Sequence, residues 1–215
     1  MEFLHSVIDF FLHLDVHLGA IIRTYGTWTY GLLFMTIFCE TGLVVAPFLP
    51  GDSLLFVAGT FAATGSLRIG LLWGVLVAAS MLGDSMNYFI GRRLGARVFE
   101  KYDSRIFKRK YLDRTQQFYE KYGGKTMIIA RFVPIVRTFA PFLAGVGKMK
   151  YRHFVIFIAL GAVLWVSVCT LSGYFFGNLP VVRNNFGLVI LAIIATSVLP
   201  TAIEIVRHRR SSHRS

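Results

Sequence analysis

Five long apolar stretches constrain the fold of this 215-residue chain more than any other feature. They cover residues 30–64, 69–91, 126–146, 154–176 and 186–205. A helix needs about 20 apolar residues to cross a bilayer, and each stretch reaches or exceeds that length. Hydrophobic residues make up 55% of the chain and charged residues only 16%, whereas soluble domains carry about 25% charged residues. The composition argues against a soluble globule and against disorder, and it predicts an all-helical membrane protein.

Lysine and arginine give the chain a formal net charge of +12, and most of them fall in three blocks beside apolar stretches. The blocks are residues 92–125, 148–152 and 207–214. By the positive-inside rule, such blocks remain on the cytoplasmic side of a membrane. A nucleic-acid patch is the alternative interpretation, but the apolar flanks disfavour it, so no nucleic-acid partner is expected. We therefore predict a cytoplasmic segment at 92–125 and a cytoplasmic C-terminal tail at 206–215.

Two apolar stretches are interrupted and are predicted to be re-entrant hairpins. The first, 30–64, is too long for one span and is broken at Pro47, Pro50 and Gly51. The second, 126–147, contains Pro134 and Pro141 and has basic blocks on both sides, so its two ends lie on the same face of the membrane. Lipid offers no partners for freed backbone groups, and such breaks are tolerated only in protein or beside a wet cavity. Interrupted segments at matching places in two halves are typical of a transporter's midplane site.

The other segments complete one polytopic domain over residues 1–215. We expect an amphipathic helix in the membrane interface at 1–26 and transmembrane helices at 69–91, 154–176 and 186–205. An internal match supports a duplication at constant spacing. It aligns Phe56, Ala58 and Gly59 with Phe142, Ala144 and Gly145, and Tyr88, Phe89 and Gly91 with Tyr174, Phe175 and Gly177. The predicted architecture is an inverted repeat of hairpin and transmembrane helix, followed by an extra transmembrane helix.

Ionisable residues in or at the ends of the apolar stretches are candidates for function. They are Glu40, Asp52, Asp84, Arg131, Arg137 and Glu204. A lone charge at the centre of a membrane helix costs about 2.5–3.5 kcal/mol on insertion scales, so such groups pair or face the protein interior. If the hairpin tips meet, two acids on one hairpin neutralise two arginines on the other. Asp84 either stabilises a helix end or lines the same cavity. The structural alternative is that the charges only hold the hairpins together.

The same charges have a functional interpretation. Arginine stays charged and grips phosphate through two parallel hydrogen bonds, so Arg131 and Arg137 are predicted to bind the phosphate of a lipid substrate. Glu40 and Asp52 are predicted to exchange protons, because acids and substrate phosphate compete for the same arginines. No Walker loop, H-E-x-x-H or G-x-S-x-G motif is present in the sequence. We therefore expect a protein that is not an enzyme and that uses neither a metal nor a cofactor.

Three groups of short motifs point to a family. They are Phe38–Gly42 with Pro47–Leu54, then Gly83–Asp84 with Asn87–Tyr88 and Gly91–Arg92, and finally Gly123–Lys125, Ala130–Pro134, Val136–Thr138, Pro141 and Ala144–Gly145. In these segments, and nearly end to end, the chain resembles the bacterial DedA family of the VTT-domain (SNARE-associated) superfamily. The resemblance implies a multi-pass inner-membrane protein with two opposed re-entrant hairpins. It also implies that Glu40, Asp52, Arg131 and Arg137 match the family's functional acids and arginines.

What the family does suggests two classes of function. Its members are associated with envelope homeostasis, dependence on the proton motive force, resistance to cationic peptides and, in several cases, return of undecaprenyl phosphate across the membrane. The resemblance thus implies a proton-coupled lipid-phosphate translocase. A proton-coupled exporter of small cations or drugs is the alternative, and an assembly factor without a substrate is a third interpretation. The expected partners are membrane lipids, a polyprenyl phosphate and protons, and a homo-oligomer is left open.

Overall fold

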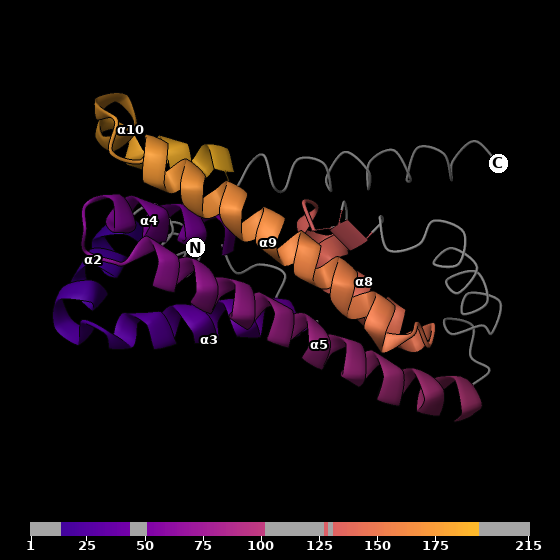
Figure 1. Ribbon diagram of the computed structural model, residues 1–215. Helices are drawn as coiled ribbons and strands as arrows, with labels where there is room; N and C mark the ends of the chain where they lie inside the picture. The colour runs from indigo at the N-terminus through magenta and orange to yellow at the C-terminus, as the bar shows by residue number, and fades with distance from the viewer. Residues whose placement is uncertain (1–13, 44–50, 102–126, 129–130, 194–215) are drawn as a thin grey trace, which may run out of the picture. The chain divides into compact units, whose positions relative to one another are not determined.

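The computed structural model describes residues 14–43, 51–101, 127–128 and 131–193, and every regular element in this part of the chain is a helix (Figure 1). The elements are α2 (Leu14–Tyr25), α3 (Trp28–Gly42), α4 (Gly51–Ala63), α5 (Ile69–Lys101), α8 (Pro134–Val146), α9 (Tyr151–Phe176) and α10 (Pro180–Asn184). Residues 186–193 are helical as well. The prediction of an all-helical chain is confirmed for the described residues.

Two of these helices are long and apolar enough to cross a membrane. The candidate spans are Ile69–Leu94 in α5 and Tyr151–Phe176 in α9, each of 26 residues, with mean hydropathies of 1.6 and 2.6. At 1.5 Å per residue, a helix of that length extends about 39 Å, more than the roughly 30 Å of a bilayer's hydrocarbon core. Helix α5 continues to Lys101, so the predicted transmembrane helix at 69–91 and the start of the basic segment at 92–125 form one continuous helix.

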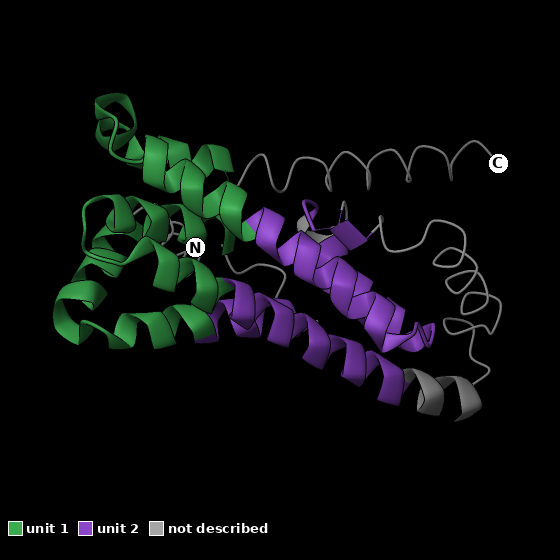
Figure 2. Cartoon of the chain, in the orientation of Figure 1, with its two compact units in different colours: residues 1–34, 50–76, 166–215 green, residues 35–49, 77–165 purple. Residues whose placement is uncertain are grey.

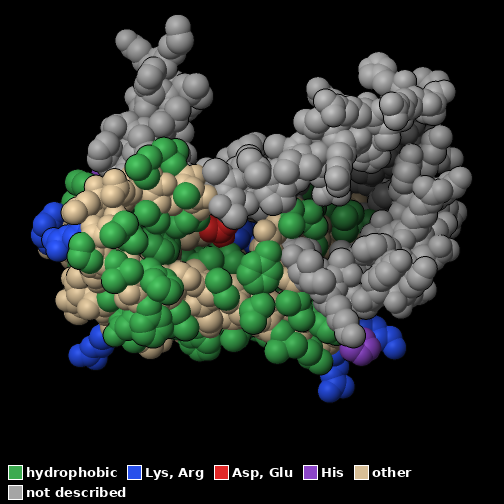
Figure 3. Space-filling model, turned by 90° about the horizontal axis from the view of Figure 1, so that it is seen from above, with side chains coloured by type: hydrophobic (Ala, Val, Ile, Leu, Met, Phe, Trp, Pro, Cys, Tyr) green, Lys and Arg blue, Asp and Glu red, His purple; other side chains and the backbone are tan. Residues whose placement is uncertain are grey.

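Apolar side chains dominate the exposed face of α9. Those spaced three or four residues apart lie along one side of a helix, and in α9 this pattern gives an exposed stripe. The stripe consists of Ile156, Leu160, Leu164, Val168, Leu171 and Phe175. Large apolar surfaces of this kind mark contact with lipid or another protein. Figure 3 shows the same character more widely, because apolar side chains cover most of the described part of the face that it draws.

The predicted breaks of the two hairpin regions differ in local structure. In 30–64, α3 ends at Gly42 and α4 begins at Gly51, while Pro47 and Pro50 lie outside the described residues. In 126–147, Val133 has an extended backbone and Pro134 starts α8, because a residue before proline disfavours helical geometry and proline suits the first helical turn. The second proline, Pro141, lies inside α8. The re-entrant path of both regions stays a prediction.

For the N-terminal segment that is predicted to be an amphipathic helix, the structure describes only the second half. Helix α2 buries Leu14, Leu18 and Gly19 on one side and leaves Val16 and His17 exposed. This one-sided burial is the pattern of an amphipathic helix. Residues 1–13, Glu204 and the predicted tail at 206–215 lie outside the described residues, as does most of 92–125.

The chain forms two compact units, which Figure 2 distinguishes by colour. Unit 1 comprises Met1–Phe34, Pro50–Leu76 and Val166–Ser215, and unit 2 comprises Met35–Leu49 and Val77–Trp165. The core of unit 2 is a cluster of apolar side chains from α5, α8, α9 and the segment before α8. It consists of Tyr88, Met127, Ala140, Ala144, Phe154 and Ile158. The candidate site lies entirely in unit 2.

Each unit contains a close helix crossing built on glycine. In unit 1, a methyl group on Gly59 of α4 would collide with the backbone of Thr170 in α9, and one on Gly173 of α9 would collide with the backbone of Phe56. Small residues allow the backbones of membrane helices to approach this closely.

In unit 2, a methyl group on Gly145 of α8 would collide with the backbone of Tyr88 in α5, and one on Gly91 of α5 would collide with the backbone of Phe142. The two crossings use residues of the short helices that the sequence alignment pairs, and the repeat itself stays a prediction. The contact of Gly91 with the backbone of Phe142 corresponds to the contact of Gly173 with the backbone of Phe56. The sequence alignment, however, pairs Gly91 with Gly177. The correspondence is shifted by one helical turn from the alignment that the sequence suggests.

Candidate functional site

Two buried ion pairs form the centre of the candidate site in unit 2. Arg131 pairs with Asp84, and their side chains are only 4% and 2% exposed. Arg137 Nη2 lies 2.5 Å from Glu40 Oε1, and these side chains are 4% and 0% exposed. A buried charge that is left alone costs several kcal/mol, so each of these pairs neutralises two groups that could not be buried singly. The structure thus brings four of the ionisable residues selected from the sequence into one unit.

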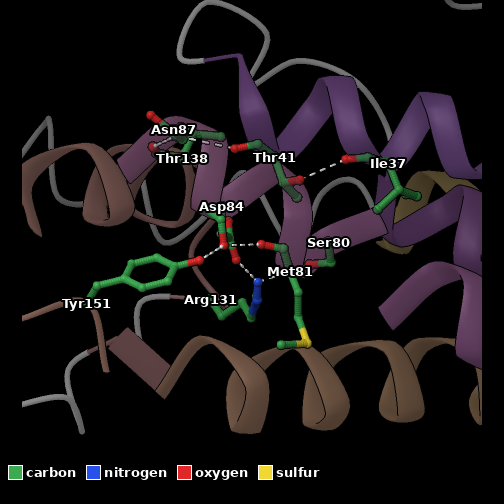
Figure 4. A network of polar contacts seen from close by, with 10 residues as sticks. Ile37, Thr41, Ser80, Met81, Asp84, Asn87, Arg131, Thr138 and Tyr151 are labelled. Atoms are coloured by element: carbon green, nitrogen blue, oxygen red, sulfur yellow. Dashed lines mark hydrogen bonds and ion pairs between the residues drawn. The ribbon is translucent and has the colours of Figure 1, made fainter. Parts of the chain in front are cut away.

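Helix α5 supplies a polar face to this site. Ser80, Asp84 and Asn87 are spaced by four and three residues, which places them on the same side of a helix, and all three are buried. Figure 4 shows Asp84 and Ser80 directed toward Arg131. Arg131 Nη2 donates a hydrogen bond to Ser80 Oγ at 2.9 Å and also bonds Asp84 Oδ2.

Asn87 joins the helices that carry the second ion pair. Its side-chain amide Nδ2 donates to the backbone oxygen of Thr41 at 3.2 Å and to that of Thr138 at 2.7 Å. Thr41 follows Glu40 near the end of α3, and Thr138 follows Arg137 in α8. Asn87 therefore holds α3 and α8 against α5 beside the Glu40 and Arg137 pair (Figure 4).

A close crossing of α3 and α5 brings Glu40 to the site. Added methyl groups would clash at both glycines of the crossing, at Gly42 with the side chain of Met86 and at Gly83 with the side chain of Thr41. Two helices with larger residues at these positions would be held further apart. The glycines thus allow the carboxylate on α3 to lie near α5 and α8.

Arg131 retains hydrogen-bonding capacity. Its Nε and Nη1 atoms and the Oδ1 atom of Asp84 are buried and have no hydrogen-bond partner among the described residues. A buried donor left without an acceptor costs about 1–3 kcal/mol, and more when it is charged. These donors are suited to the oxygens of an additional anion, because a guanidinium binds phosphate through a planar fork.

An indole ring lies beside both arginines. The Trp165 ring centroid is 4.4 Å from Arg137 Cζ and 6.0 Å from Arg131 Cζ, and the tryptophan is 2% exposed. Both distances fall within the range of a cation–π interaction. The side chain comes from α9, so α3, α5, α8, α9 and the turn before α8 all contribute to the site.

The observed pairing differs in part from the expected one. Glu40 pairs with an arginine as predicted, but Arg131 pairs with Asp84 and not with a hairpin acid. The ion pair places Asp84 beside Arg131, and its role in lining a cavity stays a prediction. Asp52 belongs to unit 1, where it occupies the first turn of α4, a favourable place for an acid at the positive end of the helix dipole. Its assignment to proton coupling stays a prediction.

Sequence reasoning missed several residues of the site. They are Ser80, Asn87, Thr138 and Trp165. The spacing of Ser80, Asp84 and Asn87 in an apolar helix was an available signal, because polar residues inside a membrane helix face the protein interior. No comparable signal exists for Trp165, since an aromatic residue in an apolar run fits a core, an interface or a lipid-facing position equally well.

Comparisons with known proteins are consistent with a membrane location. The VTT domain family model matches residues 49–175, a segment that contains Asp84, Arg131, Arg137 and Trp165. The chain is 54% identical to Protein DedA of Escherichia coli K12, and the match covers 100% of this chain and 99% of that protein. It is 46% identical to the uncharacterized membrane protein Rv0364 of Mycobacterium tuberculosis H37Rv over 85% of this chain and 82% of that one.

A more distant relative is named by its location. Inner membrane protein YghB of Escherichia coli K12 is 34% identical to the chain over 82% of its length and 78% of that protein. No solved structure matches the chain significantly.

Proposed function

This chain belongs to the VTT-domain family of DedA-type membrane proteins, and from that premise we propose that it moves a lipid phosphate across the inner membrane with coupling to protons. Undecaprenyl phosphate is the substrate that we propose. Arg131 and Arg137 bind its phosphate, and Glu40 carries a proton in the cycle. Asp52 is assigned the same proton-carrying role on sequence grounds alone.

The observation that carries the proposal is the state of Arg131. Its guanidinium is buried and bonded through Nη2 alone, while Nε and Nη1 lack hydrogen-bond partners among the described residues. Arg137 lies close enough to share the Trp165 ring with it. A phosphate group offers several acceptor oxygens, and two neighbouring guanidiniums can bind them together. A small cation would gain nothing from these donors, so the geometry favours an anionic substrate over an exported cation.

Coupling to protons follows from competition at the arginines. When phosphate binds Arg137 in place of Glu40, that carboxylate is left in a buried position without its counter-charge. A buried carboxylate in that situation is stabilised by taking up a proton. When the phosphate leaves, Glu40 releases the proton and pairs with the arginine again. Substrate binding and proton uptake are thereby linked at one residue.

The proposed membrane arrangement has its own support. We propose two opposed hairpins in an inverted repeat and a cytoplasmic C-terminus, as inferred from the basic blocks. The matching glycine crossings of α4 with α9 and of α8 with α5 support a repeat. Inverted repeats with interrupted helices are a common architecture of secondary transporters.

Reconstitution of the full chain tests the proposal. Liposomes containing undecaprenyl phosphate would be prepared with and without the protein, and an external phosphatase would measure how much of the lipid becomes accessible over time. We expect the protein to expose the inner-leaflet pool, and expect Arg137→Ala and Arg131→Ala to abolish this. Arg183→Ala, at an exposed arginine in α10, is the matched control and is expected to behave as wild type.

One outcome of this experiment would contradict the proposal. If protein-containing and protein-free liposomes protect the same fraction of lipid, the lipid-phosphate assignment is wrong. A cation flux driven by a proton gradient in the same liposomes would then support the exporter.

A further inference from the structure

We infer that Trp165 is a positioning residue that holds Arg131 and Arg137 side by side so that both bind a single phosphate group. This inference rests on the proposed function and adds to it a residue to which sequence reasoning assigned no role. It starts from the two distances to one ring, 4.4 Å from Arg137 Cζ and 6.0 Å from Arg131 Cζ.

The indole offsets the repulsion between two like charges. Two guanidiniums that approach the same point repel each other, and burial strengthens that repulsion because screening by water is lost. The face of an aromatic ring carries negative partial charge, and tryptophan binds cations best among the aromatic residues. Trp165 therefore stabilises an arrangement in which the two arginines lie close enough to share one anion.

Stacking and hydrogen bonding use different parts of a guanidinium. The N–H groups lie in the plane of the group, whereas an aromatic ring contacts its face. Arg137 makes both kinds of contact, with Glu40 Oε1 through Nη2 and with the ring of Trp165. When a phosphate displaces the carboxylate, the ring contact persists. Trp165 thus fixes the guanidinium during the exchange of one anion for another.

The backbone of α9 supports the second arginine. Gly161 lies one helical turn before Trp165, and a methyl group there would lie 3.2 Å from Arg131 Cδ. The absence of a side chain at Gly161 lets the aliphatic stem of Arg131 rest against the helix, while its guanidinium reaches toward the ring. Gly161 and Trp165 thereby form one platform on α9 for Arg131.

Binding of farnesyl phosphate, a short polyprenyl phosphate, to the full-length protein in detergent tests the inference. Trp165→Met keeps an apolar side chain but removes the ring, and we expect it to weaken binding by about 30-fold, the equivalent of a desolvated cation–π contact. Trp165→Phe keeps a ring with a weaker cation–π interaction and is expected to lie between wild type and Trp165→Met. Trp28→Phe, at a tryptophan that is 78% exposed, is the matched control and should bind as wild type.

A spectroscopic measurement separates positioning from a general effect on folding. In the Trp28→Phe/Trp73→Phe variant, Trp165 is the one remaining tryptophan of the chain. Titration with farnesyl phosphate should change its emission, and adding Arg137→Ala should abolish the change. This readout applies even if Trp165→Met fails to fold.

The outcomes distinguish the two proposals. If wild type binds farnesyl phosphate while Trp165→Met binds equally well, or while the emission of Trp165 stays constant on binding, the inference about Trp165 is overturned and the proposed function stands. If wild type does not bind the lipid phosphate, the proposed function fails and this inference fails with it.

Discussion

Arg131 and Asp84 form an ion pair in which both side chains are almost fully buried, although 47 positions separate them in the sequence. The pair connects the turn before α8 with the middle of α5. It also sets Arg131 apart from Arg137, which pairs with the acid of α3. Each arginine therefore has its own carboxylate, and the two pairs can be tested separately.

Replacing Asp84 should reveal the cost of an isolated buried arginine. Asp84→Asn removes the charge that neutralises Arg131, and we expect a loss of about 3–5 kcal/mol in the free energy of unfolding. Chemical denaturation in detergent would measure it. The control Ser80→Ala removes one hydrogen bond to the same guanidinium and should cost about 1 kcal/mol.

A second substitution tests whether the loss comes from the unpaired charge. The double variant Asp84→Asn/Arg131→Met removes both charges and should recover much of the stability lost in Asp84→Asn. If the single and double variants were equally stable, the loss in Asp84→Asn would not come from the unpaired charge of Arg131.

Lysine at position 137 should not support transport as arginine does, so Arg137→Lys is expected to be impaired. Lysine keeps the positive charge but lacks the planar fork that binds phosphate through two bonds, and it lacks the guanidinium whose Cζ lies 4.4 Å from the Trp165 ring centroid. We expect at least a tenfold loss in the rate at which lipid phosphate becomes accessible in liposomes, about 1.4 kcal/mol in activation free energy. Arg183→Lys is the matched control at an exposed position, and wild-type rates in both variants would show that charge alone suffices.

The glycine crossing in unit 2 should not tolerate a methyl group. Gly145→Ala places a side chain against the backbone of Tyr88, which cannot move aside as a flexible side chain would. We expect destabilisation of about 3 kcal/mol, at the upper end for overpacking. Thermal unfolding in detergent measures this.

The control substitution for Gly145→Ala is expected to increase the free energy of unfolding. Gly74 of α5 has open space around an added methyl group, so Gly74→Ala should stabilise the helix by up to about 1 kcal/mol through its better helix propensity. Destabilisation of similar size in both variants would mean that the crossing is not the cause.

Asn87→Ala should loosen the connection between α3, α5 and α8. The variant removes two hydrogen bonds and leaves the backbone oxygens of Thr41 and Thr138 without this donor. Each lost bond costs about 1 kcal/mol, so we expect about 2 kcal/mol in total. Asn185→Ala removes a bond at an exposed position and should change the free energy of unfolding by less than about 0.5 kcal/mol. A smaller effect at Asn87 than at Asn185 would contradict the role assigned to it.

The sequence allowed part of this site to be predicted. Glu40, Arg131 and Arg137 stand out because a charge inside an apolar stretch requires a partner. Which partner each one takes could not be inferred from the sequence. That choice depends on the close approach of α3 and α5 at Gly42 and Gly83, and a contact between residues distant in the chain leaves no local pattern.

The internal repeat shows a related limit. Gly173 lies in α9 and Gly177 directly follows the last residue of that helix, one turn later, and either can be aligned with Gly91 because glycines one turn apart present nearly the same face of a helix. Packing selects Gly173 for the contact with Phe56, through the close approach of the backbones at that turn. The sequence match paired Gly177 with Gly91, one helical turn from the glycine that makes the corresponding contact, because the register of that contact is set by tertiary structure.

The one-to-one pairing of charges determines how the site responds to voltage. Glu40, Asp84, Arg131 and Arg137 carry two negative and two positive formal charges, so this set is neutral as a whole when no substrate is bound. An electric field across the membrane acts with about 2.3 kcal/mol per net charge per 100 mV, and it exerts little net force on a neutral set that moves together. Under the proposed function, a phosphate monoester brings a charge of about −1.5 to −2 at pH 7 while Glu40 takes up one proton, so the loaded site keeps a net negative charge. We therefore expect the membrane potential to act on the loaded protein and to leave the return of the empty one almost unaffected.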